Sequence, residues 1–290
     1  MGVSKSGKSF AVRSSATAED LPDASFAGQQ ETFLNIDGFD NLIDAVRKVY
    51  ASLFTDRAIS YRRLRNFKGS LSISVGVQEM VRSDMGSSGV AFTLDTESGY
   101  KGSIFITSSY GLGEGIVQGT VNPDEFYVFK RALEKNDFPI IKKNMGEKAK
   151  KMIFADNNLP GKSVKYVKVP KKEANEFSLT NNEIIELAKY AKTIEDHYEV
   201  PMDIEWAKDG KDKKIYILQA RPETVQSKVS NYFERYTLKE KGELIVSGKS
   251  VGQKIGAGTA KVVKDVSEIK NIKPGDVLVT DMTDPDWEPV

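Results

Sequence analysis

The sequence predicts an α+β fold in which strands and helices alternate, followed by a C-terminal part of different character. Apolar residues recur at helical spacing in residues 41–66, and a second helix is predicted at 180–197. Alternation of apolar and polar side chains, the two-residue period of a strand, marks three further segments, residues 71–81, 89–94 and 103–107.

The elements follow one another in a definite order. Residues 10–13 read as a short strand, and residues 41–66 as one packing helix with a basic C-terminal half. The lysine-rich stretch 142–151 is expected to be a solvated face or loop. Thr180 followed by Glu183 forms a capping box that starts the helix ending near His197.

The chain is expected to divide near residue 225. Pro222 to Ser230 reads as the exit from a first domain, residues 1–225. Residues 252–263 and 272–279 then resemble turns and short strands of another unit. We therefore expect residues 226–290 to form a linker and the start of a second domain.

Composition excludes several function classes. The chain has 290 residues, with 42 Lys and Arg against 41 Asp and Glu, so no overall basic field favours nucleic acid or a membrane surface as a partner. The absence of cysteine excludes disulfides, thiolate metal sites and cysteine nucleophiles. Without an apolar run long enough to span a bilayer or a signal-peptide core, the expected location is cytoplasmic.

Phosphate-handling residues gather in the segment 11–34. Arg13, at the end of the first strand, offers a planar fork of donors that suits phosphate oxygens. Small hydroxyl side chains follow it directly. Residues 25–32 have the composition of a mobile flap, in which Gly28 lets backbone amides approach a ligand and Thr32 adds a donor. A strand leading into an ordinary polar loop is the alternative reading.

Residues 203–221 predict a metal-binding hairpin. The period of two places Asp203 and Glu205 on one face of a strand, and Gln219 and Arg221 on one face of the next. With Asp209-Gly210 as the turn signal, a hairpin centred near residue 212 sets Glu205 opposite Gln219 and Asp203 opposite Arg221. Carboxylate and amide oxygens suit Mg²⁺, and Arg221 would neutralise a phosphate beside it. A solvent-facing hairpin with an incidental ion pair is the alternative.

These features together resemble a known family. Besides residues 11–34, the resemblance rests on motifs in family order at residues 52–61, 121–125, 203–206, 218–222 and 280–289. The sequence is similar from end to end to the phosphoenolpyruvate synthases of the pyruvate-phosphate dikinase group. The resemblance implies an ATP-grasp nucleotide-binding domain, here incomplete, followed by the start of a swivelling β/α domain of the phosphohistidine type.

The resemblance also implies roles for individual residues. It makes Glu205 and Gln219 the Mg²⁺ ligands, with Asp203 beside them. Arg57 would face the phosphate region, although one more charge on a basic helix flank is an equal alternative. We expect the catalytic residues to be Arg13, Arg57 and Arg221. The expected ATP contacts are Arg13, Gly28, Thr32, Gln78, Met80, Val81, Glu205, Gln219 and Arg221, among which Gln78, Met80 and Val81 would form the adenine hinge.

The activity implied is conversion of ATP, pyruvate and water into AMP, phosphoenolpyruvate and phosphate. Family enzymes pass the phosphoryl group through a histidine on the swivelling domain, whereas His197 reads as structural. We expect the chain to be short at its N-terminus and to stop before that histidine, so pyruvate would engage only further C-terminal domains. Family members are often homo-oligomers. Two alternatives stay open, a rifamycin-type antibiotic phosphotransferase and a nucleotide-binding module without turnover.

One motif is expected to be a decoy. Residues 2–9 satisfy the pattern of a phosphate-binding loop ending in Lys8-Ser9. That loop works only between a strand and a helix, because the backbone amides at the helix start surround the phosphates. Here only Met1 precedes it and a strand is predicted to follow, so we do not expect nucleotide binding at these residues.

Overall fold

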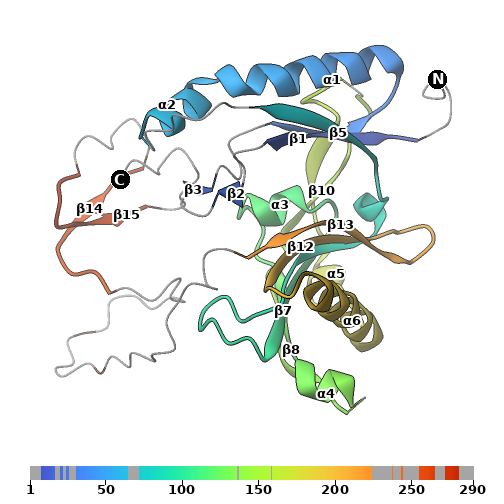
Figure 1. Ribbon diagram of the computed structural model, residues 1–290, viewed down its shortest axis with the longest axis vertical. Coiled ribbons are helices and arrows are strands. Elements are labelled where there is room, and N and C mark those ends of the chain that lie inside the picture. The colour runs from blue at the N-terminus through green and yellow to red at the C-terminus, as the bar shows by residue number, and fades with distance from the viewer. Residues whose placement is uncertain are drawn as a thin grey trace.

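A computed structural model describes residues 8–16, 20–21, 24–25, 31–64, 72–135, 137–157, 159–223, 237, 243, 255–264 and 272–280. Within them the fold combines helices with antiparallel sheets, as the sequence predicts, and adds one short parallel pair of strands. Two sheets, each covered by a helix on its outer face, dominate the molecule (Figure 1). The phosphate-loop pattern at residues 2–9 lies almost wholly outside the described residues, and a strand follows it.

The smaller sheet has the order β4-β1-β5, formed by Thr32–Ile36, Phe10–Ala16 and Ile73–Glu79, with both pairs antiparallel. Helix α1 (Phe39–Ala51) covers one face of it (Figure 1). Val12 in β1 and Ala45 and Val49 in α1 are fully buried against one another. Because neighbouring residues of a strand point to opposite faces, Arg13 projects from the face that α1 leaves open.

The prediction of one helix over residues 41–66 is wrong. Helix α1 ends at Ala51, a 3₁₀ turn occupies Ser52–Phe54, and α2 (Asp56–Leu64) begins a new helix. Thr55 breaks the run, because its ψ of 152° is extended and its hydroxyl accepts a hydrogen bond from the Ala58 amide at 3.3 Å. That is the geometry of an N-cap. Residues 65–66 lie outside the described part.

The larger sheet has the order β13-β12-β6-β7-β8-β9, and every pair in it is antiparallel. Its strands are β6 (Ser87–Phe92), β7 (Ser103–Tyr110), β8 (Asp124–Phe129), β9 (Ile140–Asn144), β12 (Met202–Lys208) and β13 (Ile215–Pro222).

Helix α6 (Asn181–Tyr198) packs on one face of this sheet and starts with the predicted capping box. The Thr180 side chain accepts from the Glu183 amide, while the Glu183 carboxylate accepts from the Thr180 amide at 2.9 Å. The apolar face of α6 closes the main core, whose fully buried members include Ile104, Ile106, Phe126, Ile184, Leu187 and Ile204.

A two-stranded ribbon connects the two sheets. It consists of β10 (Lys150–Phe154) and β11 (Val164–Lys168). Near the tip of the ribbon, Ser163 accepts a hydrogen bond from Asn35 at 2.9 Å through its carbonyl oxygen and donates one to the Leu34 carbonyl through its hydroxyl. In the middle of β10, the Met152 carbonyl accepts from the amide of Leu112, a residue that follows β7, at 2.9 Å. The ribbon therefore contacts β4 of the smaller sheet and the chain that follows β7 of the larger one.

Lys148 is an exception to the expectation that residues 142–151 are solvated, which holds for Lys142 and Lys143. Its side chain is fully buried and forms an ion pair with the fully buried Asp124. The same carboxylate accepts from the Gly146 amide at 2.9 Å and from the amide and hydroxyl of Ser178, both at 2.8 Å. Asp124 requires a cation because a buried carboxylate without one is costly.

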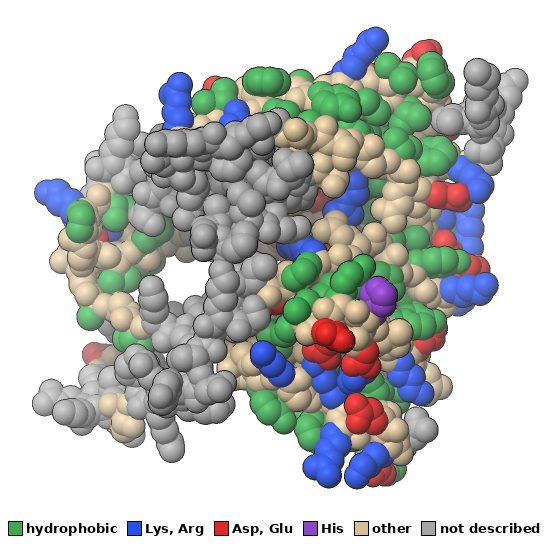
Figure 2. Space-filling model, in the orientation of Figure 1, with side chains coloured by type: hydrophobic (Ala, Val, Ile, Leu, Met, Phe, Trp, Pro, Cys, Tyr) green, Lys and Arg blue, Asp and Glu red, His purple; other side chains and the backbone are tan. Residues whose placement is uncertain are grey.

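Short elements complete the described part: β2 (Asp20–Leu21), β3 (Ala24–Ser25), η2 (Ser83–Met85), α3 (Glu114–Val117), α4 (Lys130–Glu134), α5 (Lys171–Ala174), β14 (Thr259–Val262) and β15 (Asp276–Val279). Strands β14 and β15 pair in parallel and confirm the strands expected there. None of the described helices is long and apolar enough to cross a membrane. Figure 2 shows acidic and basic side chains interspersed over the surface around α6.

Candidate functional site

The open face of the smaller sheet presents Arg13, Thr32 and Gln78. Arg13 in β1 pairs with Thr32 in β4 on one side and with Gly76 in β5 on the other. Residues directly opposite in an antiparallel pair share a face, so Thr32 lies beside Arg13. Gly76 lies next to the stem of Arg13, since a Cβ at this position would be in ordinary van der Waals contact with the Arg13 Cγ at 3.7 Å. The partner of Gln78 is Ala11, which places Gln78 on the same face.

The predicted hairpin register is confirmed on the larger sheet. Glu205 pairs with Gln219, and Asp203 pairs with Arg221. Ile204, between the two acidic residues, is buried in the core beneath α6, so Asp203 and Glu205 project from the opposite face. A bulge directly after Glu205 shifts the register of the remaining pairs.

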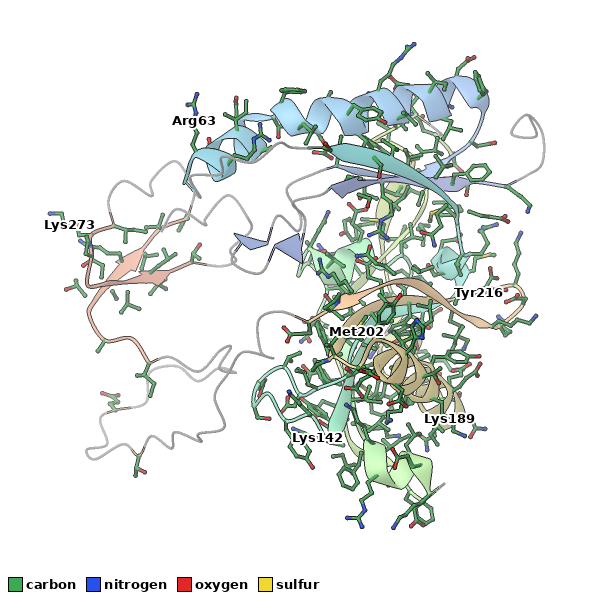
Figure 3. The ribbon with its side chains drawn as sticks, in the orientation of Figure 1. Arg63, Lys142, Lys189, Met202, Tyr216 and Lys273 are labelled. Carbon is green, nitrogen blue, oxygen red and sulfur yellow. The ribbon has the colours of Figure 1, made fainter. Side chains whose placement is uncertain are left out.

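The two faces meet through Arg13. Its Nη1 donates to Glu205 Oε2 at 3.2 Å, and its Nη2 donates to Gln219 Oε1. A second link runs from Gln78 Nε2 to the Leu218 carbonyl oxygen at 3.3 Å. In Figure 3 side chains fill the space between the smaller sheet and the hairpin, in which Met202 and Tyr216 are labelled. The hairpin and the first strand therefore form a single polar site.

Asp203 and Arg221 form a second ion pair in this site. Arg221 Nε lies 2.9 Å and its Nη2 lies 2.8 Å from Asp203 Oδ2. Burial raises the pKa of Asp203, and the guanidinium of Arg221 offsets that rise only in part. The neighbouring carboxylates of Glu205 and Glu223 raise the pKa further. The site therefore concentrates negative charge, and two of its carboxylates each have an arginine beside them, Arg13 at Glu205 and Arg221 at Asp203.

The oxygens of Glu205 and Gln219 fit a magnesium ion. Both accept from one guanidinium, so they already converge on a single cationic group. A carboxylate and an amide oxygen are hard ligands, and Mg²⁺ takes its remaining ligands from water and phosphate. No group of three or more acidic or histidine side chains in the described residues could hold a metal ion. A metal site here would thus depend on this mixed pair and on a bound phosphate.

The remaining predicted residues are placed less completely. Met80 follows β5, and its amide donates to the Ser9 carbonyl at 2.8 Å. The Val81 carbonyl accepts from the Ser83 amide at 2.8 Å. Arg57 is the second residue of α2, but its side chain lies outside what the structure describes, as does the whole of Gly28.

Two residues at the site did not figure among the predictions. Gly76 lies beside the stem of Arg13, and a glycine inside a strand pattern is the signal that would have pointed to it. Glu223 is nearly buried and acts electrostatically on Asp203. Its position two residues after Arg221, which keeps the strand period, was the available signal.

Comparison with known proteins shows the family of the chain. The family described as pyruvate phosphate dikinase, AMP/ATP-binding domain, matches residues 1–241, which is most of the chain. The chain belongs to this family. The resemblance recognised in the sequence is therefore confirmed, and so is the expectation of a nucleotide-binding domain of the dikinase group.

Individual relatives carry the name phosphoenolpyruvate synthase. The chain is 61% identical over 282 residues to that of Pseudomonas aeruginosa and 59% identical over 283 residues to that of Escherichia coli. The one from Helicobacter pylori is 54% identical over 293 residues. Between 96% and 97% of this chain is covered, and the chain spans 36% of the length of each of these curated relatives.

Proposed function

We propose that this chain is the ATP- and Mg²⁺-binding part of a phosphoenolpyruvate synthase. The observation that carries the proposal is the convergence of Arg13, Glu205 and Gln219 from two separate sheets on one point. A guanidinium that binds anions and two side-chain oxygens that can ligate Mg²⁺ are the groups that a magnesium–nucleotide complex needs. The whole reaction would convert ATP, pyruvate and water into AMP, phosphoenolpyruvate and phosphate.

In this proposal each residue has one task. Glu205 and Gln219 hold the ion, with Asp203 next to them, while Arg13, Arg57 and Arg221 bind phosphate oxygens. Gln78, Met80 and Val81 border the adenine, Thr32 approaches the phosphates from β4 beside Arg13, and Gly28 does so from the flap. The bound ion would neutralise charge on the transferred phosphoryl group. Arg13 would exchange its contact with Glu205 for one with phosphate, since both partners are anionic.

The two covered sheets with a polar site between them support the ATP-grasp assignment. In this division residues 1–225 form the nucleotide-binding domain and residues 226–290 lead into the swivelling domain. Pyruvate would act in further domains, and the location would be cytoplasmic. The similarity to phosphoenolpyruvate synthases favours this reading over an antibiotic phosphotransferase.

His197 is not positioned to accept a phosphoryl group from this site. It lies exposed in the last turn of α6, and its ring contacts Tyr198 edge-on with centroids 4.8 Å apart. Helix α6 packs on the face of the larger sheet opposite to Glu205. These 290 residues are thus proposed to bind nucleotide without completing the synthase reaction.

Titration calorimetry with ATP tests the proposal. We expect binding that strengthens when Mg²⁺ is present, and no phosphate on His197 under conditions that preserve phosphohistidine. Absence of ATP binding in the presence of Mg²⁺ would contradict the proposed function. Phosphate on His197 would contradict its placement outside the reaction.

A further inference from the structure

The segment 78–81 contacts the hairpin of β12 and β13 through Gln78 and Leu218. A second junction lies farther along the hairpin from Glu205. Arg82 follows this segment directly, and its backbone amide donates to Asp209 Oδ2 at 3.0 Å. The Arg82 carbonyl accepts from the Gly210 amide, also at 3.0 Å. Asp209 and Gly210 begin the turn between β12 and β13. The backbone of Arg82 therefore holds the end of the hairpin by two hydrogen bonds, one to the Asp209 carboxylate and one from the Gly210 amide.

The backbones at this junction are in close contact. A Cβ added to Gly86 would collide with the carbonyl oxygen of Lys208, and one added to Gly210 would collide with that of Met85. The Asp209 carboxylate also accepts from the Lys211 and Asp212 amides, at 2.6 and 3.3 Å. Three backbone amides thus converge on Asp209, which organises the turn and its attachment together.

The side chain of Arg82 is fixed as well. Its Nε and Nη2 donate to the two oxygens of Asp84 at 2.9 and 3.0 Å, and its guanidinium carbon lies 4.9 Å from the centre of the Phe154 ring. Asp84 is nearly buried. Phe154 ends the ribbon strand β10, so Arg82 contacts two separate parts of the chain, the hairpin turn and the ribbon, while Asp84 in the adjoining η2 holds its guanidinium. We call Arg82, Asp84 and Asp209 the clasp.

We propose that the clasp positions the two ends of the nucleotide site relative to each other. From Glu205 to Lys208, β12 pairs with β6 in one continuous register, although its pairing with β13 shifts directly after Glu205, so holding the turn also limits where Glu205 can lie. The link from Gln78 to Leu218 fixes the same hairpin at a second point. This inference rests on the proposed function, in which residues 78–81 border the base and Glu205 and Gln219 hold the metal–phosphate end.

The physical consequence is a gain from simultaneous binding. Once one end of ATP is bound, the other end meets its site at a high effective concentration, which raises the affinity for the whole nucleotide. A wrong spacing between the base end and the phosphate end of the site removes this gain in affinity but leaves each end able to bind its own part of the ligand. The clasp residues touch neither end of the nucleotide in this arrangement. Substitution of these residues should therefore reduce the ratio of the affinity for ATP to the affinity for a ligand that carries phosphates only.

The experiment compares ATP with inorganic tripolyphosphate, both with Mg²⁺, by calorimetry on the full chain. For Asp209→Ala we expect ATP affinity to fall on the order of tenfold, while tripolyphosphate affinity changes less than about twofold. Asp209→Asn keeps an oxygen for the Arg82 amide and should recover much of the loss. Arg82→Gln, which leaves the backbone bonds in place, is the milder second variant if Asp209→Ala does not fold.

A matched control is Glu186→Gln on the exposed side of α6, which should leave the ratio of the two affinities unchanged. Equal losses of ATP and tripolyphosphate affinity in the clasp variants would overturn the inference, because general loosening affects both ligands. Unchanged affinities for both ligands would overturn it as well. If the unmodified chain shows no preference for ATP over tripolyphosphate, the proposed base segment fails and the clasp proposal fails with it.

Discussion

Arg13 and Glu205 are 192 positions apart in the sequence, yet Arg13 Nη1 lies 3.2 Å from Glu205 Oε2. Each belongs to a different sheet, and each points away from the helix that covers its own sheet. The contact is only partly buried, with side chains 25% and 32% exposed, so water and ligands can reach it. Because the Arg13 guanidinium is held by a carboxylate and is still accessible, it can exchange this contact for one with an incoming phosphate.

The two proposed magnesium ligands, Glu205 and Gln219, give the first prediction. Glu205→Gln and Gln219→Ala should each weaken binding of Mg-ATP on the order of tenfold, because each neutralises or removes one proposed ligand. Binding of ATP without metal should change much less. Calorimetry with and without Mg²⁺ measures both quantities. Equal losses in the two conditions would contradict the assignment of these residues to the ion.

Arg13 gives the second prediction. Arg13→Ala should reduce ATP affinity, and Arg13→Lys should restore little of it, because two nitrogens of one planar group contact two different acceptors. A lysine offers a point charge and cannot reproduce that fork. The affinities of both variants for Mg-ATP are the measurement. A lysine variant close to the unmodified chain would return Arg13 to a structural role.

The buried pair of Lys148 and Asp124 gives the third prediction. Lys148→Met should lower the free energy of unfolding by about 3–5 kcal/mol, because it leaves the Asp124 carboxylate buried without its cation. Urea unfolding measures the change. Combining Lys148→Met with Asp124→Asn should be less harmful than the sum of the single changes, since the amide carries no charge and still accepts hydrogen bonds. Simple additivity of the two losses would contradict this account.

Local signals predicted the hairpin well. The turn residues Asp209 and Gly210 and the two-residue period fixed both the pairing of Glu205 with Gln219 and the face on which they lie. The capping box at Thr180 was equally readable, because it depends on residues three positions apart.

Contacts between distant segments were not predictable in this way. Lys148 reads as one more lysine in a basic stretch, because its partner Asp124 lies 24 positions away. The helix break at Thr55 was hidden because the apolar pattern continues through Leu53 and Phe54. The approach of Arg13 to the hairpin has no local signal either, and only the resemblance to a family pointed to it.

The last prediction concerns the start of α6 and its dependence on pH. Glu183 Oε1 lies 2.5 Å from the Lys208 ammonium, and its other oxygen accepts from the Thr180 amide. Partial burial acts to raise the pKa of Glu183, but the bonds from Lys208 and Thr180 outweigh it and leave the pKa below its ordinary value. In the unfolded chain the carboxylate therefore takes up a proton more readily than in the folded one.

It follows that Glu183 stabilises the fold above its unfolded pKa, and that this contribution is lost as pH falls through the lower folded pKa. Glu183→Gln keeps a capping oxygen but loses the charge, so it should cost about 0.5–1 kcal/mol near neutral pH. The difference should shrink as the pH is lowered below about 4.5. Urea unfolding of both proteins across this range measures it. Glu186→Gln, which changes an exposed carboxylate on the same helix, is the control and should show a much smaller difference at neutral pH. A difference for Glu183→Gln that stays constant or grows on acidification would show that its charge does not stabilise the fold.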